Sequence, residues 1–116
     1  MCSFSLPSVA IELANKSRAL FIVAEIYFLE TKEKRLVIKS LANAARHKHI
    51  LEALKLSLKG KPIEITCIGG GMLDISINEH TIQVSGASTE YKMEPDRNKT
   101  VEMIANWFRR YRVSKV

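Results

Sequence analysis

The chain has 116 residues, 47% of them hydrophobic and 26% charged, with only five Gly and three Pro. This is the composition of one folded domain, and it excludes a disordered chain or a protein with two cores. Eighteen Lys and Arg against twelve Asp and Glu give a formal net charge of +6, which favours anionic partners without saying which anion.

The sequence predicts a cytoplasmic domain that does not contact membranes. Its N-terminal stretch carries Glu12 and lacks a basic start followed by an unbroken apolar run, which argues against a signal peptide. The longest apolar run, Ala19–Ile26, is interrupted by Glu25 and is too short to span a membrane. Because Cys2 and Cys67 lie far apart, neither a disulfide framework nor a metal-ligand spacing is indicated. We expect a monomer.

The first elements in chain order are two strands. Leu20–Phe28 is rich in β-branched and aromatic residues and is apolar on both faces, which is typical of a central strand. A charged turn, Thr31–Lys34, separates it from a second short strand, Arg35–Lys39. The two strands are therefore predicted to be neighbours in one sheet.

A helix is predicted next, from Ala42 to the Gly60–Pro62 breaker. Apolar residues recur there at three- and four-residue steps and form one stripe: Ile50, Leu51, Leu54 and Leu58. Asn43, or Ser40 before it, is the candidate N-cap.

The second half predicts an antiparallel meander, a helix and an edge strand. Three runs alternate with period two: Ile63–Ile68, Met72–Ile77 and Thr81–Val84. A helix follows Asp96, and the basic tail Arg109–Val116 is expected to add a last strand. The order β-β-α-β-β-β-α-β indicates an α/β (α+β) fold in residues 1–116, with one mixed, largely antiparallel sheet of about six strands and two packed helices.

The start of the first helix carries the clearest chemical signal. Residues 44–49 (AARHKH) place cations where the helix dipole is positive, an arrangement that an anion would relieve. Free backbone N–H groups at such a start bind phosphate well. The same surroundings should keep the His47 imidazole neutral, as a base or nucleophile requires. The alternative is that Arg46, Lys48 and His49 face water and His47 caps the core stripe.

Two further segments are candidate anion contacts. Gly69, Gly70 and Gly71 follow a strand and allow a close backbone approach, although a bulge or bend in the meander explains them equally well. They lack the features of a nucleotide-binding P-loop or a dinucleotide fingerprint. Ser88 and Thr89 offer two adjacent hydroxyls, which are also ordinary turn formers. No metal-binding motif is visible, so no metal or cofactor is predicted.

Together these segments resemble the Janus/Ocnus family of phosphohistidine phosphatases. His47 stands 22 residues before Gly69, as the active-site histidine of that family stands before its glycine triplet. The stretch Thr81–Ser88 followed by Tyr91 is similar to a family strand that ends in Gly-x-Ser and a tyrosine. Residues 7–11 (PSVAI) resemble a Pro-x-Val-x-Ile stretch, which aligns Arg18 with a phosphate-binding lysine.

The resemblance implies a metal-independent phosphatase acting on phosphohistidine, or on phospholysine, in proteins or peptides. His47 would attack phosphorus or activate water. Arg18, Ser88, Thr89 and backbone groups near Lys48, Gly71 and Glu90 would hold the phosphoryl oxygens or a phosphate or sulfate ion.

Four positions depart from the family pattern. Met72 stands where a family enzyme has an arginine, so that phosphate contact is either missing or supplied by Lys48 or Lys39. Lys39 itself replaces an arginine of the second strand. Glu90 replaces a small residue beside the phosphate loop, and its carboxylate would repel substrate if it pointed inward. Lys92 replaces a glycine.

A second hypothesis is a binding module of the same fold without turnover. Residues 107–112 (WFRRYR) interleave aromatic rings and arginines, a composition that can stack on bases and contact the phosphates of nucleic acid. The plainer interpretation of this segment is a helix end that faces the core, followed by a solvated edge.

Overall fold

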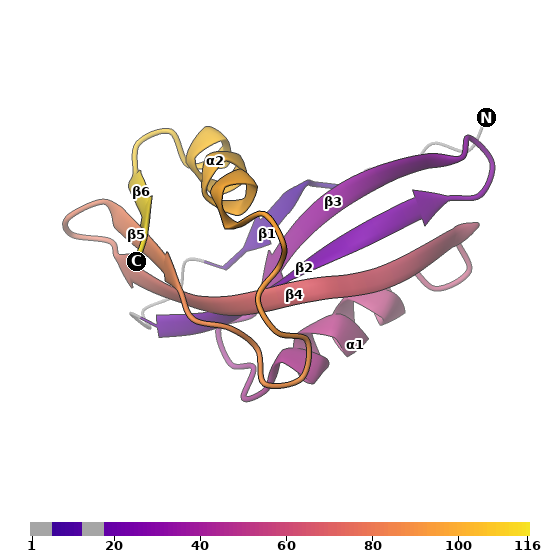
Figure 1. Cartoon of the computed structure of the whole chain (residues 1–116), viewed down its shortest axis with the longest axis horizontal. Coiled ribbons are helices and arrows are strands. Elements are labelled where there is room, and N and C mark those ends of the chain that lie inside the picture. Colours follow the sequence, from indigo (N-terminus) through magenta and orange to yellow (C-terminus); the bar gives the residue numbers. More distant parts are fainter. Residues whose placement is uncertain (1–5, 13–17) are drawn as a thin grey trace.

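Six strands form one sheet, with a helix on each of its two faces (Figure 1). The computed structural model describes residues 6–12 and 18–116. In chain order the elements are β1 (Val9–Ile11), β2 (Arg18–Phe28), β3 (Glu33–Ser40), α1 (His47–Ser57), β4 (Ile63–Ser76), β5 (Thr81–Ser85), α2 (Arg97–Trp107) and β6 (Arg112–Lys115).

The strands lie in the order β1-β3-β2-β4-β5-β6. β1 pairs in parallel with β3, and β6 in parallel with β5, whereas the inner pairs are antiparallel. The sheet is therefore mixed and largely antiparallel, which confirms the predicted fold class. The edge strand expected in the basic tail is also present, as β6.

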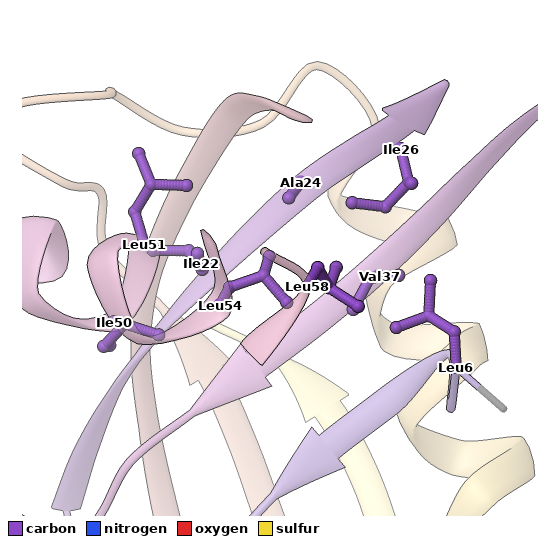
Figure 2. Packing of buried hydrophobic residues seen from close by; sticks show 9 residues of the cluster. All are labelled: Leu6, Ile22, Ala24, Ile26, Val37, Ile50, Leu51, Leu54 and Leu58. Carbon is purple, nitrogen blue, oxygen red and sulfur yellow. The ribbon is translucent and has the colours of Figure 1, made fainter. Parts of the chain in front are cut away.

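Strand alternation divides the core into two layers. On one face Ile22, Ala24 and Ile26 of β2 pack beneath α1, and Figure 2 shows nine side chains of this cluster. On the other face Phe21 and Val23 pack against residues of β4, β5 and α2. The even-numbered residues of β2 thus face α1 and the odd-numbered ones face α2, which fixes the side of the sheet on which each candidate residue lies.

The start predicted for the first helix is wrong by five residues. α1 begins at His47, with Arg46 as an extended N-cap residue that has no capping side chain. The Ala42 N–H, near the predicted start, instead donates to the Glu12 carboxylate at 2.8 Å. Ser40 belongs to β3, and its hydroxyl donates to the Leu20 carbonyl at 2.6 Å, so neither it nor Asn43 caps the helix.

The glycine triplet does not separate two strands. β4 runs unbroken from Ile63 to Ser76, so two of the predicted meander strands are one. The register with β2 shifts beside the triplet, because Val23 pairs with Gly69 and Ala24 pairs with Cys67. The extra residue is a bulge, as one of the two interpretations of the glycines proposed. β1 was not predicted from periodicity, since three residues show no period.

Candidate active site

His47 is the first residue of α1 and lies against the glycine segment of β4. Its side chain is buried, with the residue 7% exposed. The ring nitrogen Nε2 lies 2.9 Å from the Gly71 carbonyl oxygen. A carbonyl oxygen only accepts hydrogen bonds, so Nε2 carries the proton and donates it. In the neutral imidazole the free electron pair is therefore on Nδ1.

Nδ1 is the ring nitrogen of His47 that is left without a hydrogen-bond partner among the described residues. By contrast, every fully buried side-chain nitrogen or oxygen of the described residues has one. Nδ1 is consequently in contact with solvent, although most of the ring is covered. The geometry orients an unshared electron pair outward at the start of a helix, which suits a base or a nucleophile.

The glycines create the space in which this ring lies. A Cβ on Gly70 would collide with the backbone of Phe21 and come within 3.1 Å of His47 Cδ2. A Cβ on Gly71 would collide with the Ser85 carbonyl, and one on Gly69 would collide with the backbone of Glu94. The triplet is thus required by the close approach of three backbone segments, and the imidazole lies beside its middle residue.

The N-terminus of α1 already holds an anion, the carboxylate of Glu90. Glu90 Oε1 accepts from the Lys48 backbone N–H at 3.3 Å, and Oε2 accepts from the Arg46 guanidinium at 3.3 Å. The carboxylate therefore acts as a cap supplied from a distant loop. The sequence predicts an anion at this helix start and places Glu90 beside it, but it does not reveal that Glu90 is that anion.

The predicted hydroxyl contacts are used differently. Ser88 is buried, and its hydroxyl oxygen accepts from the amides of Glu90 at 3.1 Å and Tyr91 at 3.0 Å. Its backbone also pairs with Lys92. Ser88 thus forms the turn, as the plainer interpretation proposed, and the Glu90 amide is occupied within it. Thr89 is exposed at the tip of the same turn.

Arg18 and Lys39 lie on the same face of the sheet as His47, without contacting it. Arg18 is an even-numbered residue of β2, and its Nε donates to Asp74 Oδ1 at 2.9 Å on the paired strand. Asp74 is three residues beyond Gly71, the hydrogen-bond partner of His47, so the partners of Arg18 and His47 are about 10 Å apart along β4. Lys39 pairs with Ile22, which pairs with Gly70 in turn, so about two strand spacings, roughly 10 Å, separate Lys39 from Gly70.

A buried ion pair, which the sequence did not predict, joins Glu94 in the loop before α2 to Arg97, the first residue of α2. Arg97 donates to the Glu94 carboxylate at 2.8 and 2.9 Å, and the residues are 8% and 1% exposed. The guanidinium also donates to the Gly86 carbonyl at 2.8 Å and the Gly70 carbonyl at 3.3 Å. Thr100 donates its hydroxyl to the same carboxylate. The two side-chain partners of this cluster are local in sequence, but its carbonyl partners come from β4 and from the loop after β5, which meet α2 only in the folded chain.

Burial raises the pKa of two groups near this face. The Cys67 thiol has a raised pKa mainly because it is desolvated, with smaller opposing effects of the Gly69 backbone and the positive charge of Lys55. Burial is also the first cause of the raised pKa of Tyr91, followed by the negative charges around it. Neither group is thereby activated as a nucleophile at neutral pH.

Among residues 6–12 and 18–116, no three His, Cys, Asp or Glu side chains gather closely enough to bind a metal ion. The helices in this part of the chain are also too short or too polar to cross a membrane. Cys2 and most of the stretch considered as a signal peptide lie outside the described residues.

Comparison with known families gives one result. The model of the Janus/Ocnus family (Ocnus) matches residues 4–112, which is nearly the whole chain. Curated proteins give no match.

Proposed function

The chain belongs to the Janus/Ocnus family, and we propose that it is a metal-independent phosphatase that hydrolyses the P–N bond of phosphohistidine in proteins or peptides. The observation that carries this proposal is the hydrogen bond from His47 Nε2 to Gly71, which leaves Nδ1 unshared and accessible at a helix start. The similarity to phosphohistidine phosphatases supplies the reaction, and the geometry supplies the reacting atom.

Two routes to the products use the same atom. As a nucleophile, Nδ1 forms a bond to phosphorus while the P–N bond to the substrate breaks, and water then hydrolyses the phosphorylated His47. As a base, Nδ1 takes a proton from a water molecule whose oxygen attacks phosphorus. In both routes phosphohistidine and water give histidine and inorganic phosphate, and the leaving imidazole nitrogen receives a proton.

The charge that develops on the phosphoryl oxygens would be stabilised by the helix start. The Lys48 amide and the Arg46 guanidinium are donors there, and both now bind Glu90. Substrate binding therefore requires the Glu90 carboxylate to move aside. Arg18 and Lys39 lie farther away, where they would contact the protein or peptide that carries the phosphate.

The test is phosphate release from phosphohistidine and phospholysine peptides, with and without a chelator. We expect release from the native protein that a chelator does not lower, and no release from His47→Ala. His80→Asn is the matched control, because it removes an imidazole in the turn between β4 and β5, which tolerates Asn at its positive φ of 56°.

Turnover by His47→Ala at the native rate would contradict the mechanism. Absence of release from any phosphoramidate peptide by the folded native protein, with phosphate still bound, would instead favour a binding module of the same fold.

A further inference from the structure

A second site lies on the opposite face of the sheet from His47. A groove of about 480 Å³ separates α2 from β3 and the start of β1. Leu36, Met103 and Trp107 give it an apolar lining, while Lys34 and Lys99 bring positive charge to it. α2 and α1 cover opposite faces (Figure 1), so this groove is separated from the candidate active site by the thickness of the sheet.

Trp107 is the most unusual component of the groove. It is the only tryptophan of the chain and is 51% exposed. A large aromatic side chain left half in water at the end of a helix contributes little to the core, and its flat ring is available for stacking. The predicted core-facing helix end therefore does not describe Trp107, although Phe108 does pack on the α2-face cluster.

The charges around the groove favour a polyanion. The residues that line it include no carboxylate, and Lys34 and Lys99 bring two positive charges to it. The Arg35 side chain belongs to the α1 face, because Arg35 pairs with Ile26. Two carboxylates touch these cations from outside, Glu25 at 3.9 Å from Lys34 and Glu102 at 3.7 Å from Lys99. These ion pairs are long and exposed, so they are weak and a phosphate can displace them. Two exposed arginines, Arg109 and Arg110, follow one residue after Trp107.

We propose that this groove binds single-stranded nucleic acid, with one base stacked on Trp107 and the adjoining phosphates on Lys34 and Lys99. Stacking on exposed aromatic rings together with backbone contacts to cations is how proteins hold single strands without reading their sequence. The groove is within the size range of sites for small ligands, which suits one nucleotide at a time. An acidic peptide would bind the same cations, but its recognition would not require an exposed indole ring beside them.

The unique tryptophan makes the binding directly measurable. We expect a twelve-residue oligothymidine to quench the fluorescence of Trp107 and a glutamate-rich peptide of equal length to leave it unchanged. Two phosphate contacts predict that log K falls against log salt concentration with a slope of about −1.4, since each contact on a single strand contributes roughly −0.7. Quenching by the acidic peptide at lower concentration than by the oligonucleotide would overturn the proposal in favour of a peptide site.

Substitutions separate the two components of the site. With a labelled oligonucleotide, Trp107→Leu should weaken binding about tenfold through lost stacking, and Lys99→Ala should reduce the salt slope by about 0.7. Lys59→Ala is the control, because it removes one exposed positive charge just beyond α1, on the other face. Equal effects of Lys59→Ala and Lys99→Ala would show only non-specific attraction and refute the site.

The inference does not depend on the proposed phosphatase activity. Oligonucleotide binding should be the same in His47→Ala and in the presence of inorganic phosphate at a concentration that fills the His47 site. Loss of binding in His47→Ala, with the protein folded, would place the oligonucleotide in the active site and overturn the second site.

Discussion

Replacing Glu90 with alanine should make the protein bind phosphate more tightly. The Glu90 carboxylate occupies the start of α1, where its two hydrogen bonds are both 3.3 Å long. A bound phosphate must displace this carboxylate and then tolerate its negative charge nearby. The substitution removes both costs and leaves the Lys48 amide and the Arg46 guanidinium free.

The size of the effect follows from the contacts. An exposed ion pair and an anion at a helix start each contribute up to about 1 kcal/mol, so displacement costs about 1 kcal/mol. A carboxylate about 8 Å from a phosphate dianion in water adds up to about 1 kcal/mol of repulsion, less with salt. The sum, about 1–2 kcal/mol, corresponds to a rise in phosphate affinity of roughly 5- to 30-fold. Stability should fall by no more than about 1 kcal/mol.

The assay is a phosphate titration followed by the amide resonance of Lys48 at low ionic strength. Glu64→Ala is the matched control, because it removes one exposed carboxylate from the α2 side of β4. Glu64→Ala changes the net charge by the same amount as Glu90→Ala but leaves the start of α1 unaltered. Unchanged affinity in Glu90→Ala, or the same increase in Glu64→Ala, would refute the competition between Glu90 and phosphate.

Four other substitutions test the scaffold. Gly70→Ala should destabilise the fold by about 1–3 kcal/mol in urea denaturation and reduce turnover, because its Cβ collides with β2 and crowds the His47 ring. Arg97→Met should cost about 3–5 kcal/mol, since it leaves the Glu94 carboxylate buried and unpaired, and the double variant with Glu94→Met should recover part of this loss. Lys92→Gly should raise the free energy of unfolding by up to about 1 kcal/mol, because Gly adopts the positive φ of 64° without strain. The melting temperature should rise accordingly. Burial raises the pKa of the Cys67 thiol above its unfolded value of 9.0, so its contribution to stability is complete below pH 9 and declines above it. Urea midpoints at pH 8 and pH 10 should therefore differ less in Cys67→Ala than in the native protein.

Local patterns in the chain were sufficient for most of the secondary structure. The apolar run in β2, the stripe of α1 and the alternation of the basic tail each depend on neighbouring residues, and all three elements are present. The family resemblance also rests on linear features, the spacing from His47 to the glycines above all. These features indicated which residues to examine for chemistry.

Contacts between distant residues decided the rest. The start of α1 and the occupant of its N-terminus depend on Glu90, which is 42 residues beyond Lys48. The continuity of β4 through three glycines depends on backbone and side chains that approach from β2, β5 and α1. The sequence by itself determined most of the elements, the fold class and the reacting histidine to test. Only the tertiary structure decided which nitrogen of that histidine is free and which carboxylate competes with substrate, because these depend on groups that meet only after the chain has folded.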